Sequence, residues 1–357
     1  MSVTRYLAVG NLSSVNTWDI RFLFANPAVE FLHTGPGRDV FKKESRRFRA
    51  ILADTRRGAY DLVFAGNNAF PYFNPRKGVV RNSSNLVWKV LTHPNLLKGG
   101  VFPYARLGSP LAGIDMEDRP VVDNRWFHIL EHSVCFFKRE LPQNPCNAFL
   151  YTTAKTECNG NVQHSEIFQR WIKKLRPISL GIEPDLCRRY ADIDTGKKTD
   201  VFFAGDLHNR PNRQAGIRQL ERLQAEGYAI DIAREKLSRE EFLRRCAQAR
   251  LVWSPEGFGW DCFRHYEIAL VGSVPLMQSP TIQRYAPFMD EEHAIYYCVE
   301  ADHLAVRVRQ ALHNRARLVE MGQAARQHVL KWHTHEALSR YVIEETKRTL
   351  AESRMSK

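Results

Sequence analysis

The 357-residue chain is longer than a single hydrophobic core usually allows, so we expect two domains of similar size. Its hydrophobic fraction of 44% and charged fraction of 25% are those of an ordinary soluble globular protein. No apolar run approaches the roughly 20 residues that a membrane span needs. The net charge of +13 favours anionic partners, whether nucleotide sugars, nucleic acid or the anionic face of a membrane.

The seven cysteines never form a CxxC pair, so they do not have the spacing of a metal site. An odd number of cysteines in a chain of this length is typical of reduced thiols in the cytosol. The opening residues, MSVTRYLAVGNL, have no long apolar core behind a basic region, so we expect no signal peptide. We therefore expect a cytoplasmic protein, whose basic surface permits peripheral contact with the inner face of the membrane.

The N-terminal half alternates short apolar runs with amphipathic segments, which predicts a parallel sheet covered by helices. Strands are expected at 5–10, 30–34, 60–66, 101–107, 147–153 and 176–181. Helices are expected at 17–24, 41–55, 82–92 and 163–174, and 125–141 is interpreted as a helix or a strand–helix pair. A loop rich in Gly, Pro and Asp is expected at 108–123. Residues 1–182 are thus predicted to form the first domain.

Residues 183–198, rich in Asp, Pro, Gly and Lys, are predicted to be a linker. In the second domain, 199–333, strands are expected at 199–206, 229–232, 251–253, 274–277 and 295–299. Helices are expected at 214–226, 238–249, 262–271, 302–314 and 315–346, with a break at Trp332-His333. Ser238, followed three residues later by Glu241, forms a capping box that begins one of these helices.

The second domain is organised around 251–277, LVWSPEGFGWDCFRHYEIALVGSVPLM, which reads as strand, glycine loop, helix, tight turn and strand. Gly257 and Gly259 let the backbone of the loop approach a ligand closely. Asp261 is a plausible N-cap of the helix, and Gly272 ends it. This is half of a doubly wound sheet, and such sheets bind ligands at the carboxyl ends of their strands.

Arg264 and Glu267 are three residues apart, so they share one face of the first turns of this helix. An arginine beside a helix N-terminus suits phosphate charge, and a glutamate accepts hydrogen bonds from ribose hydroxyls. The pair therefore suits a nucleoside diphosphate. The competing interpretation is a surface Arg–Glu pair that stabilises the helix by about a few tenths of a kcal/mol.

A second phosphate cradle is predicted where strand 199–206 ends. Gly205 is followed by the basic loop DLHNRPNRQ and then by a helix. The cations of this loop are Arg210 and Arg213, which a competing interpretation treats as ordinary exposed arginines.

The stretch around Arg264 resembles the donor-binding segment of the GT-B glycosyltransferases, in particular the bacterial polysaccharide enzymes and exostosin-like proteins. The matching motifs are Ser254-Pro255-Glu256-Gly257, Arg264-His265-Tyr266-Glu267 and Gly272-Ser273-Val274-Pro275. The resemblance is strong over 199–297 and faint before it. Many retaining members carry two glutamates eight residues apart, whereas Glu256 and Glu267 are eleven apart. Glu256 is therefore kept only as a candidate donor-binding residue of the glycine loop.

The resemblance implies an α/β protein of the GT-B fold, with two Rossmann-like domains facing a cleft. The first domain is expected to hold the acceptor and the second the nucleoside-diphosphate sugar, and the last helix, 334–357, is expected to cross back to the first domain. Arg264 and Glu267 are the expected catalytic residues. The expected donor-binding residues are Gly205, Arg210, Arg213, Ser254, Glu256, Gly257, Gly259, Arg264, Glu267 and Ser273.

The sequence does not identify the base that an inverting enzyme needs. His33, at the end of a predicted strand, is our candidate, although a lone histidine is more often part of a core or a surface. The other options are Asp19, His128, Glu131 and His132. Asp192-Ile193-Asp194 has the Asp-x-Asp pattern of a metal site, but it lies in the predicted linker with no strand before it, so we expect no metal.

These observations predict a metal-independent glycosyltransferase without a cofactor. It would move a sugar from a nucleoside-diphosphate donor to a glycan or lipid-linked acceptor in cell-surface polysaccharide biosynthesis. One alternative is a basic protein that binds or modifies nucleic acid, but no helix-turn-helix, RRM, KH or zinc-finger pattern is found. A dinucleotide-dependent oxidoreductase is disfavoured because Gly10 stands alone where a G-x-G-x-x-G turn is needed.

Overall fold

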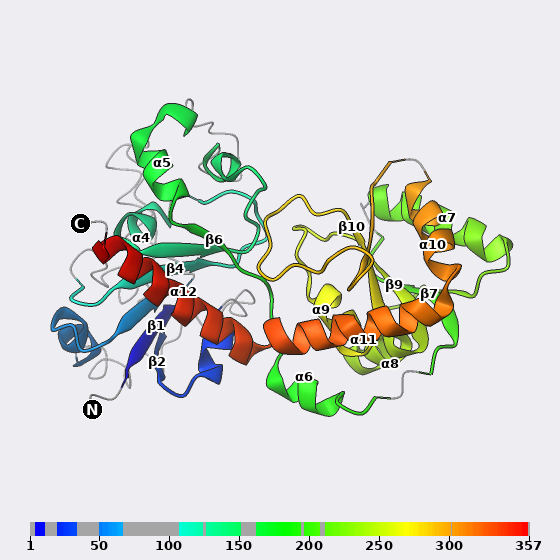
Figure 1. Cartoon of the computed structure of the whole chain (residues 1–357), viewed down its shortest axis with the longest axis horizontal. Coiled ribbons are helices and arrows are strands. Elements are labelled where there is room, and N and C mark those ends of the chain that lie inside the picture. The colour runs from blue at the N-terminus through cyan, green and yellow to red at the C-terminus, as the bar shows by residue number, and fades with distance from the viewer. Residues whose placement is uncertain are drawn as a thin grey trace, which may run out of the picture. The chain divides into compact units, whose positions relative to one another are not determined.

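The computed structural model describes residues 4–10, 20–33, 50–66, 107–123, 126–150, 162–193, 196–207, 211–300 and 302–355. The contacts within the chain separate it into two compact units (Figure 1). The first unit is Met1–Ile178 together with Leu338–Lys357, and the second is Ser179–Ala337. The domain boundaries predicted from the sequence lie after residues 182 and 333.

In the described part of the first unit, six parallel strands form a sheet in the order β2-β1-β3-β4-β5-β6. The strands are β1 Tyr6–Gly10, β2 Val29–His33, β3 Leu62–Ala65, β4 Leu111–Asp115, β5 Cys135–Lys138 and β6 Leu175–Pro177. Strands β1, β3, β4 and β5 are buried throughout, as expected of continuous apolar runs in a parallel sheet that is covered on both faces.

Short helices connect these strands. They are η2 Arg21–Ala25, a helical segment at 50–56, α4 Phe127–His132, η6 Pro145–Phe149, η7 Val162–His164 and α5 Glu166–Ile172. The range 125–141 is thus a helix followed by a strand, the reverse of the strand–helix order that we had considered. The strand expected at 147–153 is wrong, because 145–149 form a 3₁₀ helix that Asn144 caps by accepting from the backbone amide of Cys146. The helix expected at 82–92 lies outside the described residues.

The loop expected at 108–123 contains a central strand instead. β4 is buried along its whole length, and Gly113 is needed there because a Cβ would lie 2.4 Å from Cδ2 of Phe136 on β5. Asp115 ends the strand and forms a 3.0 Å ion pair with Lys138, in which both side chains are buried. The glycine and the aspartate, which suggested a loop, are therefore packing and pairing residues of a strand. The strand expected at 101–107 lies outside the described residues except for its last residue.

The C-terminal helix, α12 His335–Met355, belongs to the first unit from Leu338 onward. The Tyr341 hydroxyl donates to the Pro177 carbonyl at 2.8 Å, and Arg176 donates through Nε to Glu345 at 2.6 Å. Both contacts attach the helix to edge strand β6. The chain therefore returns to its first unit, as the predicted fold class requires.

In the described part of the second unit, five parallel strands form a sheet in the order β11-β10-β9-β7-β8. The strands are β7 Thr199–Ala204, β8 Ile230–Ala233, β9 Ala249–Ser254, β10 Val274–Gln278 and β11 Ile295–Tyr297. The helices are α6 Pro184–Arg189, α7 Pro211–Ala225, α8 Arg239–Gln248, α9 Phe263–Leu270, α10 His303–Leu312 and α11 Arg315–Trp332. The predicted linker therefore contains a helix, α6, which begins at a proline as helices commonly do.

The order of the second sheet contains a topological switch point. Strand β7 lies between β8 and β9, so the chain moves to one side of β7 and then crosses to the other. Strand β7 is thus the point from which the sheet extends to β8 on one side and to β9, β10 and β11 on the other. Doubly wound sheets bind their ligands at the carboxyl ends of strands beside such a switch.

The buried His333 and the half-buried His328 pack behind α9. The carbonyl of Ala286 accepts hydrogen bonds from Nε2 of His328 at 2.8 Å and from Nε2 of His333 at 2.9 Å. Because its Nε2 is the donor, the neutral His333 ring accepts at Nδ1 from the Ser179 hydroxyl, 2.8 Å away. Burial lowers the pKa of His333 to about 3, and burial also lowers the pKa of His265 on α9 to about 3.

These two histidines should make the protein less stable in mild acid. Both rings stay neutral in the fold, whereas the unfolded chain takes up protons below the usual pKa of 6.5. Their contribution is fully present above pH 6.5 and declines as the pH falls toward 3. At pH 5.5 each ring should cost about 1.4 kcal/mol of the free energy of unfolding.

Urea unfolding at pH 7.5, 6.5 and 5.5 measures this loss before carboxylates begin to titrate. His333→Gln, which removes one titrating ring, should show a shallower decline than the parent protein. An unfolding free energy that stays level between pH 6.5 and 5.5 would contradict the prediction.

Candidate functional site

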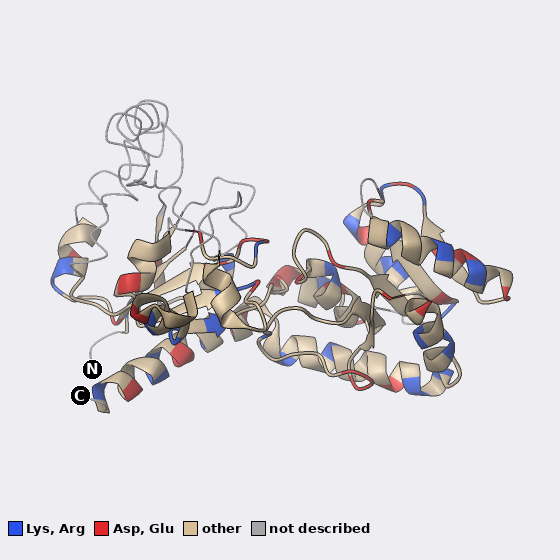
Figure 2. Cartoon of the chain, turned by 90° about the horizontal axis from the view of Figure 1, so that it is seen from above, with Lys and Arg blue, Asp and Glu red and all other residues tan. Residues whose placement is uncertain are grey.

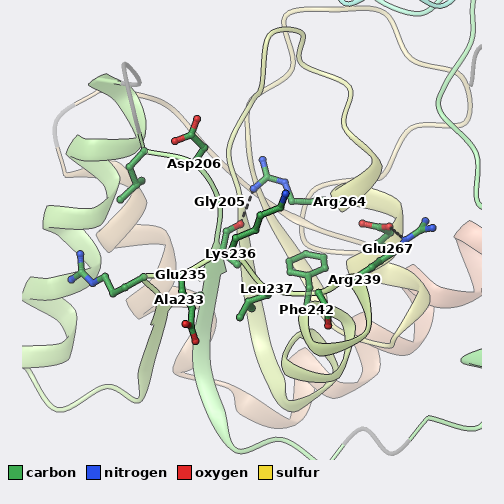
Figure 3. Close-up of a pocket in the computed structure, with 14 residues that line it drawn as sticks. Gly205, Asp206, Ala233, Glu235, Lys236, Leu237, Arg239, Phe242, Arg264 and Glu267 are labelled. Carbon is green, nitrogen blue, oxygen red and sulfur yellow. Dashed lines mark hydrogen bonds and ion pairs between the residues drawn. The ribbon is translucent and has the colours of Figure 1, made fainter. Parts of the chain in front are cut away.

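A pocket of about 890 Å³ lies at the carboxyl ends of β7 and β8 in the second unit (Figure 3). This volume is in the range of small-molecule sites, about 300 to 1,000 Å³. The lining residues come from the two strand ends, the loops after them, the start of α8 and one face of α9. They are Ala204, Gly205, Asp206, Leu207, Ala233, Arg234, Glu235, Lys236, Leu237, Ser238, Arg239, Phe242, Arg264 and Glu267.

Helix α9 brings two charged side chains to this pocket. Arg264 and Glu267 lie about one turn apart and both line it, as their spacing of three residues predicts. The next residues along the helix, His265 and Tyr266, are buried on its other side. The helix therefore presents charged groups to the pocket and is held in place by buried groups behind them.

The start of α9 differs from the prediction in the role of Asp261. The N-cap is Cys262, and its side chain makes no capping hydrogen bond. Asp261 is buried instead, and it accepts from the Tyr266 hydroxyl at 2.5 Å and from the Leu180 backbone amide at 2.8 Å. Its carboxylate therefore ties α9 to the segment before α6. Burial, followed by the Asp261 carboxylate, raises the pKa of Tyr266 well above its usual value.

The guanidinium of Arg264 lies over the carboxyl end of β7. Nη1 donates to the Ala204 carbonyl at 3.0 Å, and Nη2 donates to the Pro255 carbonyl at 3.3 Å. Gly205 makes room for this approach, because a Cβ there would lie 2.8 Å from Nη1. No carboxylate of the described residues is paired with Arg264, so its charge is available to an anion in the pocket.

Glu267 places a carboxylate in the pocket wall. The residue is buried, and its Oε1 accepts from Nε of Arg239 on α8 at 2.8 Å. Figure 3 shows the two side chains pointing toward one another at the rim of the pocket. The carboxylate is thus paired on one side and faces the pocket on the other.

Arg213, which we predicted to bind phosphate, connects two loops instead. It is the third residue of α7, it is buried, and it donates to the carbonyls of Asp206 and Glu256 at 2.8 and 2.7 Å. It does not line the pocket. Its predicted contact with phosphate therefore stays a prediction. Arg210 lies outside the described residues.

The glycine loop after β9 lies beside the pocket without lining it. The Gly257 amide donates to the Gly259 carbonyl at 2.9 Å, which closes a tight turn. Glu256 contributes its carbonyl to Arg213, as described above, and its side chain does not line the pocket. The Ser254 hydroxyl is fully buried and lies 2.9 Å from Nδ1 of His265, so the predicted donor contact of this side chain is corrected.

Ser273 lies at the opposite edge of the sheet. It precedes β10 and is therefore at the amino end of a strand, where its hydroxyl donates to the Cys246 carbonyl at 2.6 Å. It accepts from Nζ of Lys197 at 2.8 Å, and the same ammonium donates to the carbonyls of Ala247 and Gly272. Burial lowers the pKa of Lys197 to about 8. The predicted donor contact of Ser273 is corrected, because this residue supports the ends of α8 and α9.

The candidates for a catalytic base lie in the first unit. His33 is the last residue of β2, at the carboxyl edge of the sheet. Glu131 accepts from Arg170 and from the indole of Trp171, and the Arg170 contact lowers its pKa. His128 and His132 stack with ring centroids 4.9 Å apart. Asp19 lies outside the described residues.

Sequence reasoning missed the contribution of the loop after β8. Lys236 from that loop and Arg239 and Phe242 from the start of α8 line the pocket, although none of them was a predicted site residue. A signal was present, because the charged run Arg234-Glu235-Lys236 directly follows a predicted strand. Carboxyl ends of parallel strands lie at one edge of a sheet, so this run belongs beside Gly205.

Within the described residues, no group of three or more His, Cys, Asp or Glu side chains is arranged to hold a metal ion. Asp192 ends a short turn after α6, and Asp194 lies outside the described residues. No helix in the described part of the chain is both long and apolar enough to cross a membrane.

No protein-family model and no curated protein matches the chain. Among solved structures, it is similar to Anabaena HepE in complex with UDP, with a TM-score of 0.51 and 10% identity over 97% of this chain and 100% of that one. It is similar to an alpha-glucosyltransferase in complex with UDP and a 13-mer DNA containing an HMU base, with a TM-score of 0.51 and 8% identity over 98% of this chain and 100% of that one. The chain therefore has the α/β fold of the GT-B glycosyltransferases, and the predicted fold class is confirmed.

Proposed function

We propose that the protein is a glycosyltransferase that takes a sugar from a nucleoside-diphosphate donor. The observation that carries the proposal is the meeting of the Arg264 guanidinium and the Glu267 carboxylate in one pocket at the switch point of the second sheet. A cation and an acceptor at such an edge suit the diphosphate and the ribose of one ligand. The two solved structures of this fold named above contain UDP, which supports the proposal.

In this proposal, Arg264 stabilises the diphosphate as negative charge develops on it. A cation that is already fixed by two backbone carbonyls needs no reorganisation when the bond to the sugar breaks. Lys236 lines the same pocket and adds a second positive charge. The fixed Arg264 cation, with the further charge of Lys236, is the basis for proposing a reaction without a metal.

The Glu267 carboxylate accepts hydrogen bonds from the ribose hydroxyls in this proposal. Hydrogen bonds to a charged group contribute more than neutral ones, about 1.5 to 3 kcal/mol. The pocket volume suits a nucleotide, and Phe242 gives it an apolar wall. His33 stays our candidate for a base that takes the acceptor proton.

The acceptor in this proposal is a glycan or a lipid-linked intermediate of cell-surface polysaccharide biosynthesis. The net charge of +13 supports an acceptor that is anionic or held at an anionic membrane surface. In this setting the enzyme acts in the cytoplasm, with peripheral contact to the inner face of the membrane.

Thermal unfolding with UDP, GDP, ADP, CMP and their sugars tests the donor class. A ligand present at 100 times its dissociation constant stabilises the fold by about 2.7 kcal/mol. A rise in the unfolding temperature with one nucleotide and its sugar identifies the donor base. A rise only with DNA or RNA would favour the nucleic-acid alternative and overturn the proposal.

Glu267→Gln should weaken the binding of that nucleotide at least about tenfold, because the ribose hydroxyls then meet a neutral amide. Isothermal titration calorimetry measures the loss. Glu241→Gln is the matched control, since Glu241 is an exposed carboxylate on α8 that pairs with its own arginine, Arg244. Equal affinities in the Glu267 variant and the control would disprove the role of Glu267.

Substitutions at two glycines should differ in their effects on nucleotide affinity and on the free energy of unfolding. A Cβ at Gly205 would displace the Arg264 guanidinium, whereas a Cβ at Gly227 meets no atom within 4 Å but is strained by a φ of +96°. The Cβ at position 205 would also lie 3.1 Å from Cζ of the buried Phe203, so Gly205→Ala should lower nucleotide affinity about tenfold and also cost some stability. Gly227→Ala should lower the free energy of unfolding by about 1 kcal/mol and leave affinity unchanged.

Calorimetry and urea unfolding of both variants test this difference. The opposite pattern, with affinity lost at position 227 and kept at position 205, would show that Arg264 does not act in binding.

A further inference from the structure

Arg239 stands where a helix ordinarily disfavours a cation. Ser238 is the N-cap of α8 and accepts from the Glu241 amide at 3.1 Å, so Arg239 is the first residue of the helix. The positive end of the helix dipole lies there and repels an arginine. A residue that breaks a local preference in this way marks a candidate functional or strained site.

The position of Arg239 brings it to the carboxylate that faces the pocket. Its Nε donates to Oε1 of Glu267 at 2.8 Å, and its own side chain is 45% exposed. The Glu267 side chain is only 9% exposed. Among the described residues, Glu267 makes no other hydrogen bond with its side chain. Arg239 thus fixes one carboxylate oxygen and leaves Oε2 for a group in the pocket.

A second carboxylate lies near the guanidinium of Arg239. Nη1 of Arg239 lies 3.8 Å from an oxygen of Glu183, the residue that precedes α6. The arginine therefore lies between two glutamates from different segments. The pair with Glu183 is long and exposed, so the 2.8 Å contact is the one that orients Glu267.

We propose that Arg239 is a positioning residue that makes Glu267 selective for ribose over 2′-deoxyribose in the nucleotide. This inference rests on the proposed function, because it assumes that a nucleotide enters the pocket. A free glutamate rotates to accept from whichever single hydroxyl is present. A glutamate whose Oε1 is fixed presents Oε2 in one orientation. The two lone pairs of that oxygen suit the two adjacent hydroxyls of a ribose, and one of them stays unfilled when a hydroxyl is removed.

A purely structural role for Arg239 gives a different result. If the arginine only neutralises a buried carboxylate, its loss changes stability or lowers affinity for all nucleotides by the same factor. If it positions the carboxylate, its loss changes the ratio of affinities for ribo- and deoxyribonucleotides. The ratio is therefore the quantity to measure.

The probes are the pairs UDP and dUDP, GDP and dGDP, ADP and dADP, and CDP and dCDP, titrated by calorimetry into the full chain. The parent protein should bind one ribonucleotide about tenfold or more tightly than its deoxy partner, the value of one hydrogen bond to a charged group. Arg239→Gln should bring this ratio close to one. Arg239→Lys, which keeps the charge but not the planar donor, should give an intermediate ratio.

Arg244→Gln is the matched control, because Arg244 lies on the same helix and pairs with the exposed Glu241 away from the pocket. Its ratio should equal that of the parent. In a double-mutant cycle, Glu267→Gln and Arg239→Gln should be non-additive in their effects on the ratio, since both act through one carboxylate.

The possible failures are distinguishable. If the parent protein binds none of the eight nucleotides, the proposed function itself is wrong. If it binds a nucleotide and Arg239→Gln keeps the parent ratio, the positioning role is wrong and the proposed function stands. If Arg239→Gln does not fold, Arg239→Lys decides, because an unchanged ratio in that variant also overturns the inference.

Discussion

The site depends on how α9 is fixed at the end of β9. The His265 ring donates through Nε2 to the Trp260 carbonyl and lies 2.9 Å from the Ser254 hydroxyl, so it spans the turn between strand and helix. Burial keeps this ring neutral, which lets it donate on one side and accept on the other. Together with the contacts of Arg213 and Arg264 to carbonyls of the glycine loop, this ring fixes the turn from which Arg264 and Glu267 project.

The same helix is also held from behind. Asp261 accepts from Tyr266 and from the Leu180 amide, and Lys197 donates to carbonyls near the C-terminal ends of α8 and α9. Buried polar groups are costly unless they are paired, so these contacts define one position of the helix rather than merely adding stability. The two polar clusters lie at opposite ends of α9 and together set the direction in which its pocket face points.

The residues that the sequence predicted well are those whose geometry is local. Arg264 and Glu267 share a face because helical spacing requires it, and Gly205 follows a strand that its apolar run marks clearly. The directions of the hydroxyls were not predictable, because helical or strand spacing does not relate Ser254 to His265, 11 residues away, or Ser273 to Lys197, 76 residues away. Arg239 was missed for the same reason: it meets Glu267 only because parallel strands bring successive loops to one edge.

The charges of the second unit support a binding site rather than a broad basic surface. Figure 2 shows Lys and Arg interspersed with Asp and Glu along its helices, and several arginines there form ion pairs. Such pairs are Arg222–Asp302, Arg309–Glu226 and Arg315–Asp200. Among the described residues, Lys236 and Arg264 have no carboxylate partner, although both line the pocket. Unpaired positive charge is thus present where a diphosphate is proposed to bind, and the paired arginines outside the pocket disfavour a nucleic-acid surface on those helices.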